Sequence, residues 1–390
     1  MHLITLKDWS VEDVHQAVER GLDVKTNPQH YAGALSGRTV ALLFQKTSTR
    51  TRCAAEIGAT QLGGHALYLD WQNTNFGLAD LGDEFRVLSS YSDFIVARLL
   101  EHEDVRRAAD ASQVPLMNGC CNRYHPLQAL TDLMTLQESF GRLEGLRLTY
   151  VGVLNNVANS LIAAGVRVGL HVTCVCPEIN AAARDDALYA TAADKGLYEL
   201  TEDLQPALEK SDAVYTDTWI DMEFFSDPKF AGEKERRVRL FHPYQLNAEL
   251  LSGLDLKILH CLPAHHGYEI EGALLHDERS LIFTQAENRL HSQKAVLLKL
   301  ADALAQIRAQ RLIAEHFERL GYALVKRPGH HRQHGLAAAG NGQSAGLGIG
   351  GEEIGKLVEV FADLGDGHGL NHFLPFVLFL VLFNVQIYVT

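Results

Sequence analysis

The stretch VALLFQKTSTRTR, residues 40–52, joins an apolar run to a dense cluster of hydroxyl and basic side chains. Its first five residues are apolar and follow Gly37 closely, which is typical of a short strand buried in a parallel sheet. We expect a loop after this strand and then a helix over residues 49–62. At such a turn, backbone N–H groups, the helix dipole, hydroxyls and guanidinium groups converge on one point, which suits a phosphate.

The same alternation of short apolar runs and helical segments continues along the chain. Further strands of the first half are predicted at residues 66–69, 94–97 and 114–119, and a connecting helix at residues 125–140. A βαβ unit is predicted from a strand at 148–152, a helix at 159–169 and a strand at 171–176. Later strands are predicted at residues 213–215, 257–260 and 281–283. This pattern predicts an α/β protein with two lobes, each a parallel sheet flanked by helices, joined by interdomain helices.

Length and charge narrow the class of protein. A chain of 390 residues favours two domains over one, and a formal net charge of -13 argues against a surface that binds nucleic acid. The basic cluster at residues 46–52 is too short for a duplex, so we expect a small anion there. The six cysteines form no CxxC pair or zinc-site spacing, and the N-terminus lacks the order of a signal peptide. Reduced thiols in a cytoplasmic protein follow from these observations.

The C-terminal part has a different composition. A glycine-rich segment begins near residue 327 and is interpreted as linker or disorder. The apolar run 373–389 is near the lower length limit of a membrane span and has no flanking basic residues that would set its orientation. We interpret it as a tail unrelated to the rest of the chain, with a tail anchor as the alternative. The predicted domains are residues 1–138, residues 139–305 and an extension at 306–390.

The cluster FQKTSTRTR resembles the carbamoyl-phosphate loop of the ornithine carbamoyltransferases, whose usual form is F-x-K-x-S-T-R-T-R. Four more motifs follow in that family's order: DFIVAR with Arg98, HPLQ at 125–128, HCLPA from His260, and AENRLHSQKA around Arg289. The resemblance covers about residues 3–305. It implies transfer of a carbamoyl group from carbamoyl phosphate to an amine, with phosphate leaving and with no metal or organic cofactor.

The resemblance also implies which residues bind carbamoyl phosphate. They are Ser48, Thr49, Arg50, Thr51, Arg98, His125, Gln128, Cys261, Leu262 and Arg289. Catalytic roles fall to Arg98, His125, Asp217, Cys261 and Arg289. Positive charge and preorganised donors would stabilise the tetrahedral oxyanion and the departing phosphate. His125 would donate to the carbonyl oxygen and Gln128 would contact the carbamoyl NH₂, while Cys261 and Asp217 would place and deprotonate the amine.

The acceptor amine is expected to contact Asn156, Asp217, Asp221 and Met222. The motif DTWIDME at 217–223 differs from the family's common D-x-W-x-S-M-G, so Asp221 replaces a serine. A carboxylate at that position would repel an α-carboxylate. We expect L-ornithine as the acceptor, giving L-citrulline, with putrescine or another amine as the alternative.

The sequence disfavours three other functions. A non-catalytic carbamoyltransferase-like subunit should lose a phosphate-loop arginine or the HPLQ histidine, and this chain keeps both. A nicotinamide dehydrogenase is disfavoured because Gly152 is not followed by the dinucleotide-binding spacing. The aspartate branch is disfavoured because it usually has H-P-L-P-R where this chain has HCLPA. The family resemblance further implies a homotrimer in which a loop near Asn75 reaches a neighbouring active site.

Overall fold

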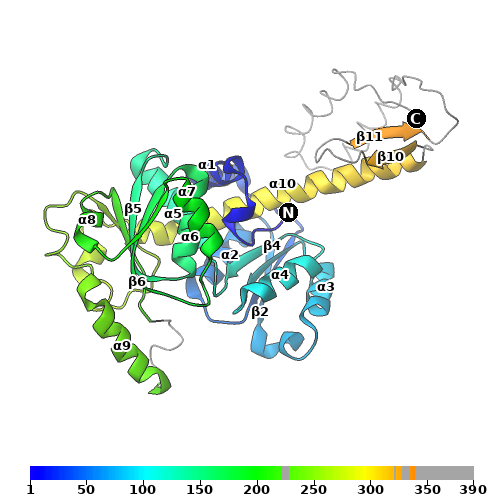
Figure 1. Ribbon diagram of the computed structural model, residues 1–390. Helices are drawn as coiled ribbons and strands as arrows, with labels where there is room; N and C mark the ends of the chain where they lie inside the picture. Colours follow the sequence, from blue (N-terminus) through cyan, green and yellow to red (C-terminus); the bar gives the residue numbers. More distant parts are fainter. Residues whose placement is uncertain (221–227, 320–321, 327–333, 339–390) are drawn as a thin grey trace. The chain divides into compact units, whose positions relative to one another are not determined.

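The computed structural model describes residues 1–220, 228–319, 322–326 and 334–338 (Figure 1). The chain divides into two compact units, Met1–Leu300 and Ala301–Thr390. The first unit contains two separate parallel sheets, one of four strands and one of five. The described part of the second unit contains one antiparallel pair, β10 (Tyr322–Lys326) and β11 (His334–Ala338).

The first sheet has the strand order β2-β1-β3-β4. Its strands are β1 (Thr39–Phe44), β2 (His65–Asp70), β3 (Phe94–Arg98) and β4 (Leu116–Cys120). Its helices are α2 (Thr49–Gln61), α3 (Leu81–Tyr91) and α4 (His102–Ala111). The chain leaves β1 to one side for β2 and then returns to pair β3 on the other side, so the strand order reverses between β1 and β3. Phe44 pairs with Arg98 at this point, which is where open α/β sheets bind ligands.

The second sheet has the order β7-β6-β5-β8-β9. Its strands are β5 (Arg147–Leu154), β6 (His171–Ile179), β7 (Tyr198–Thr201), β8 (Ala213–Thr216) and β9 (Lys257–His260). Figure 1 shows α6 (Asn156–Val168) and α7 (Asp186–Asp194) on one face of this sheet and α8 (Leu204–Leu208) on the other. Helix α9 (Ala231–Phe241) follows the undescribed residues 221–227. The order reverses between β5 and β8, so this sheet has a second ligand-binding edge.

Three longer helices complete the first unit: α1 (Val11–Thr26), α5 (Pro126–Phe140) and the first part of α10 (Ile282–Arg319). Helix α5 leads from β4 of the first sheet to β5 of the second, and all its residues from Pro126 to Leu136 are buried. It is tied to α10 by the hydroxyls of Thr131 and Ser292, 2.6 Å apart. The short 3₁₀ helices are Leu6–Asp8, Pro28–Tyr31, Trp71–Asn73, Asn75–Gly77, Pro228–Phe230, His242–Tyr244 and Gly272–His276.

The predicted fold class is confirmed, because both lobes are parallel sheets flanked by helices. The predicted strand at 281–283 is wrong: Ile282 begins α10, and only an isolated bridge from Ile258 to Ser280 precedes it. A three-residue apolar run has no resolvable period, and here Ile282 is buried while Phe283 is 51% exposed. The structure also contains the edge strand β7, which the sequence did not predict.

The C-terminal predictions lie largely outside the described residues. The segment predicted as linker from residue 327 contains β11, which pairs with β10, so linker is wrong for residues 334–338. The apolar run 373–389 falls among the residues that the structure does not describe. Within the described ranges, no helix is both long and apolar enough to cross a membrane. The predicted domain boundaries at 138 and 305 stay a prediction.

Candidate active site

The motif FQKTSTRTR at residues 44–52, called the phosphate loop below, lies where β1 ends and α2 begins, beside the end of β3. Ser48 is the N-cap of α2, and its hydroxyl accepts a hydrogen bond from the backbone N–H of Thr51 at 3.3 Å. This cap uses only one of the N–H groups of the first turn, so the others remain available to an anion. Thr51 is buried, whereas Thr49 is exposed at the first position of the helix.

Two arginines bring positive charge to this helix end. A guanidinium N–H of Arg50 donates to the backbone oxygen of Leu262, which joins the phosphate loop to the HCLPA segment. Burial lowers the pKa of Arg50, and the nearby Arg98 adds to this effect. Arg98 donates from Nη1 to the Gly119 oxygen at 3.4 Å, while its buried Nε has no hydrogen-bond partner within the described part of the chain. A bound anion would relieve this concentration of like charge.

Arg289, on α10, is 3% exposed, and its guanidinium contacts Thr51, Gln128 and His125. Nη2 donates to the Thr51 hydroxyl at 2.8 Å, and Nη1 donates to the side-chain oxygen of Gln128. Nη1 also lies 3.5 Å from Nε2 of His125. Burial lowers the pKa of Arg289 to about 10, so the guanidinium still carries its charge at neutral pH. Its Nε makes no hydrogen bond to any described residue.

His125 stands at the start of α5, where Pro126 occupies the first helical position. Its backbone N–H donates to the Ser160 hydroxyl at 2.7 Å, which fixes this helix end against α6. Burial and the charge of Arg289 hold the pKa of His125 well below its ordinary value, so the ring is neutral. Its Nδ1 is buried and unpaired with respect to the described side chains. A neutral ring keeps one N–H that a carbonyl oxygen could accept.

On the second lobe, Asp217 follows β8 and Cys261 follows β9, so adjacent strand ends bring them together. The Cys261 thiol donates to Oδ1 of Asp217 at 3.0 Å, and the Asn155 amide donates to Oδ2 at 2.9 Å. Burial, and then the negative charge of Asp217, raise the pKa of Cys261 well above its ordinary value. The thiol therefore stays protonated at neutral pH, which suits a group that positions a ligand better than one that removes a proton.

The two asparagines after β5 have different surroundings. Asn155 caps α6 by accepting from two backbone N–H groups, and it also holds Asp217. Asn156, which was predicted to contact the amine, donates to the backbone oxygen of Cys121 at 2.6 Å and lies 3.2 Å from Sγ of Cys120. The sequence did not single out the role of Asn155 toward Asp217, because it depends on pairing between β5 and β8.

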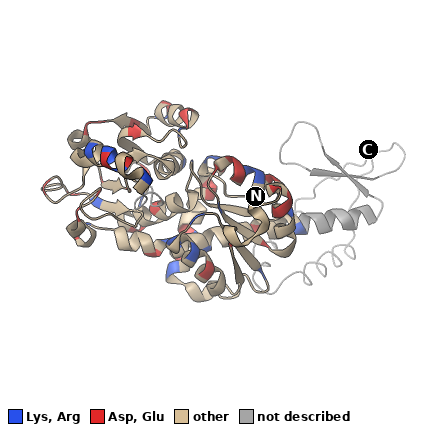
Figure 2. Ribbon diagram, turned by 90° about the horizontal axis from the view of Figure 1, so that it is seen from below, with Lys and Arg blue, Asp and Glu red and all other residues tan. Residues whose placement is uncertain are grey.

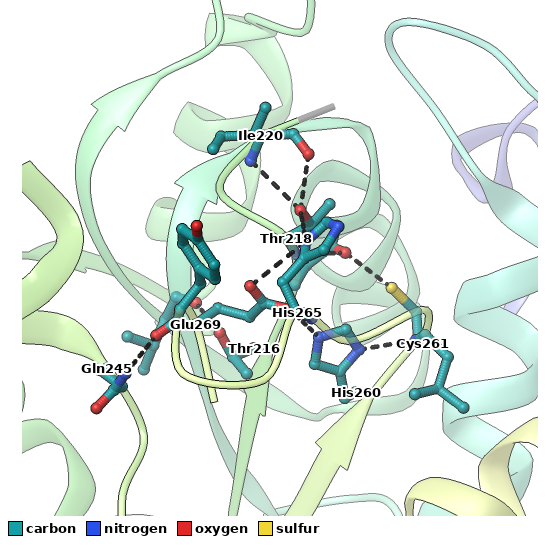
Figure 3. A network of polar contacts seen from close by, with 12 residues as sticks. Thr216, Thr218, Ile220, Gln245, His260, Cys261, His265 and Glu269 are labelled. Atoms are coloured by element: carbon teal, nitrogen blue, oxygen red, sulfur yellow. Dashed lines mark hydrogen bonds and ion pairs between the residues drawn. The ribbon is translucent and has the colours of Figure 1, made fainter. Parts of the chain in front are cut away.

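A buried network holds the HCLPA segment in place (Figure 3). Nδ1 of His260 accepts from the Leu262 N–H at 2.8 Å, so its proton is on Nε2, which lies 3.1 Å from Oε1 of Glu269. The same Glu269 oxygen accepts from the His265 N–H at 2.6 Å. The ring of His265 lies 3.0 Å from the Thr218 hydroxyl, which in turn donates to the Ile220 oxygen. The network therefore links HCLPA to the segment that leads into residues 221–227.

Several predicted site residues are not brought into contact by the described structure. Asp221 and Met222 lie outside the described residues. Asn75 is exposed at the start of a 3₁₀ helix.

Along the described ranges, no cluster of three or more His, Cys, Asp or Glu could hold a metal ion. Figure 2 shows Lys and Arg interspersed with Asp and Glu along the helices.

Comparisons with known proteins agree with this geometry. Residues 1–138 match the family described as aspartate/ornithine carbamoyltransferase, carbamoyl-P binding domain, and residues 144–300 match its Asp/Orn binding domain. The ornithine carbamoyltransferase of Anoxybacillus flavithermus is 39% identical over 306 residues, which cover 76% of this chain and 95% of that protein. That of Moritella profunda is 38% identical over 304 residues, covering 77% and 99%.

Solved structures give the same result. Ornithine carbamoyltransferase from Pyrococcus furiosus has a TM-score of 0.70 and 38% identity, with 76% of this chain and 96% of that chain covered. The enzyme from Thermus thermophilus has a TM-score of 0.68 and 37% identity, with 77% and 98% covered. Matched over both of its lobes, this chain belongs to the aspartate/ornithine carbamoyltransferase family.

Proposed function

We propose that the protein transfers the carbamoyl group of carbamoyl phosphate to the side-chain amine of L-ornithine, giving L-citrulline and phosphate. The observation that carries this proposal is the buried Arg289 guanidinium, which contacts Thr51 of the phosphate loop together with Gln128 and His125. Relatives and solved structures that bear the name ornithine carbamoyltransferase support ornithine as the acceptor.

The proposed roles follow from the charge that each group can stabilise. The phosphate binds at the N-terminus of α2, held by Ser48, Thr49, Arg50 and Thr51. Arg98 bridges the phosphate and the carbonyl oxygen, and the Arg289 guanidinium and the neutral His125 ring donate to that carbonyl oxygen. These donors face the oxygen that becomes negative in the tetrahedral intermediate, where such stabilisation counts most. The Gln128 oxygen accepts from the carbamoyl NH₂.

The acceptor is proposed to lie against the second lobe. Its amine meets the Asp217 carboxylate and the protonated Cys261 thiol, which hold it in line with the carbonyl carbon, and Leu262 contributes its backbone to the carbamoyl phosphate side. Asn156, Asp221 and Met222 would meet the rest of the amino acid. Asp221 favours putrescine as the second candidate, because putrescine has no α-carboxylate to be repelled.

We also propose a homotrimer in which a neighbouring subunit's loop completes each site. An open cavity of 620 Å³ beside the phosphate loop supports this arrangement, since it gives a neighbouring loop room to enter. Thr47, Ser48, Thr49 and Tyr68 are among the residues that line the cavity, and the Arg52 guanidinium stacks on the Tyr68 ring. An active monomer in a mass measurement would contradict the trimer. The six free cysteines support a cytoplasmic location, and citrulline formation would serve arginine biosynthesis.

One experiment tests the function. Purified protein is incubated with carbamoyl phosphate and either ornithine, putrescine, lysine or aspartate, and the carbamoylated product is measured. Citrulline should dominate, and Arg50→Ala should abolish product with every amine because the phosphate loses its charged contact. Arg107→Ala is the matched control, because among the described residues this exposed arginine forms its ion pairs with Asp80 and Asp104 on the surface. A wide preference for putrescine would overturn ornithine as the acceptor.

A further inference from the structure

Asp132 is a fully buried carboxyl in the middle of α5, and none of the five predicted motifs assigns it a role. It lies one turn after Gln128 on the same helix. Its Oδ1 accepts from Nε2 of Gln128 at 2.7 Å and from Nε2 of Gln285, on α10, at 2.6 Å. One oxygen therefore receives the side-chain amides of two different helices, both of which reach the site.

The chemistry of these amides decides which way each faces. A carboxyl oxygen that receives two amide groups acts as an acceptor, so each glutamine turns its NH₂ toward Asp132 and its oxygen away. The Gln128 oxygen consequently faces Arg289, and the Gln285 oxygen accepts from the backbone N–H of His260 at 3.0 Å. Without such an anchor, an amide can rotate by half a turn and present a donor where an acceptor is needed.

We propose that Asp132 is a positioning residue that fixes the Gln128 amide, so that its oxygen is presented to the carbamoyl NH₂, and that fixes Gln285 against the start of HCLPA. This inference rests on the proposed binding of carbamoyl phosphate. The Gln128 oxygen has two lone pairs, one for Arg289 and one for the ligand NH₂. A rotated amide would place its own NH₂ against both donors, so the ligand would lose a hydrogen bond and meet repulsion.

A charge-balancing role is the competing account, because Asp132 lies near the buried cation of Arg289. The second carboxyl oxygen separates the two accounts. Oδ2 of Asp132 and the hydroxyl of Tyr215 are both buried and have no hydrogen-bond partner of ordinary length among the described residues, yet Tyr215 is near enough to lower the pKa of Asp132. An asparagine at this position keeps the Oδ1 acceptor and places its NH₂ toward Tyr215. Asp132→Asn therefore removes the charge but keeps the anchor.

The test measures ligand binding by calorimetry and needs no acceptor amine. The probes are phosphonoacetamide, which carries a phosphonate and a carboxamide, and inorganic phosphate, which has no NH₂ for Gln128. Asp132→Leu and Gln128→Leu should each weaken phosphonoacetamide about tenfold, the effect of roughly one hydrogen bond. Phosphate binding should change by less than about twofold, because its proposed contacts lie at the start of α2 and on Arg98, and none of them is with Gln128.

Two further variants make the result specific to the Gln128 amide. The double variant Asp132→Leu/Gln128→Leu should bind phosphonoacetamide no more weakly than Gln128→Leu alone, since residues that act through one another are not additive. Asp132→Asn should weaken it by no more than about threefold. Asp132→Ser replaces Asp132→Leu if that variant does not fold, because its hydroxyl is too short to reach both amides.

Several outcomes would overturn the proposal. They are unchanged phosphonoacetamide binding in Asp132→Leu, additive losses in the double variant, and an Asp132→Asn variant as weak as Asp132→Leu, which would favour charge balance. Equal loss of both probes would also overturn it, because the effect would then not act through the carbamoyl NH₂. If the natural chain forms no citrulline, the proposed acceptor fails, while the comparison of the two probes still decides the role of Asp132.

Discussion

Replacing Arg289 with lysine keeps the charge but removes the planar guanidinium. The natural side chain makes two charge-assisted hydrogen bonds, to Thr51 and to Gln128, and has Nε left for the ligand. A lysine ammonium reaches at most one of these partners with good geometry. Hydrogen bonds to charged groups contribute roughly 1.5–3 kcal/mol each. Losing one or two of them in the transition state should lower kcat/KM by about 10- to 10⁴-fold.

The assay is citrulline formation at varied carbamoyl phosphate, with thermal unfolding measured in parallel. Arg279→Lys is the matched control, since Arg279 also uses its guanidinium fork, toward Asp277 and the backbone oxygens of Leu251 and Leu254, away from the site. The control should lower the unfolding temperature without a comparable loss of kcat. An Arg289→Lys enzyme that retains kcat/KM within threefold of the natural chain would refute the reasoning.

Three more predictions follow from buried groups. Burial raises the pKa of Asp132 in the folded protein to about 7. As pH rises from about 4 to about 7, this carboxyl therefore ionises in the unfolded chain before it does in the folded protein, and the stability of the fold falls. The unfolding temperature of Asp132→Asn relative to the natural chain should therefore rise between pH 5 and 8; a constant difference would contradict the shift. Burial and Asp217 keep Cys261 protonated, so iodoacetamide should label it more slowly than exposed Cys53 at pH 7.5. The labelling rate of Cys261 should rise only at high pH, as peptide mass analysis would show. Fast labelling at pH 7.5 would indicate a thiolate. Glu269→Ala should destabilise HCLPA by roughly 1–3 kcal/mol and raise the KM for the amine, whereas Glu271→Ala, which removes one exposed hydrogen bond to Ala248, should do neither.

Near the candidate site, the sequence predicted the local structure best at the ends of strands. Ser48 to Thr51 follow an apolar run that predicted a short buried strand and then a helix, and β1 and α2 lie there. The residue types after the strand already indicate an anion, because hydroxyls and arginines at a helix start have few other uses together. The predicted family is confirmed by the matches over both lobes.

Local pattern failed where an apolar run was short or where its surroundings decided the outcome. The pattern of residues 281–283 is compatible with a strand and with the start of a helix. In the structure Ile282 is buried as the first residue of α10. Strand β7 was missed because it has only four residues and lies at a sheet edge, where Leu200 is 45% exposed.

The two-lobed α/β class and an anion site at residues 48–51 could be predicted from the amino-acid sequence, because both depend on runs of adjacent residues. Which distant groups meet became apparent from the folded chain: Arg289 with Thr51 and Gln128, Asp217 with Cys261, and Asp132 with two glutamines. Such contacts depend on strand order and on the packing of α5 against α10, which bring together residues far apart in the chain. The physical reason is that a buried polar group is positioned by the partners that satisfy it, and these partners come from other elements of the fold.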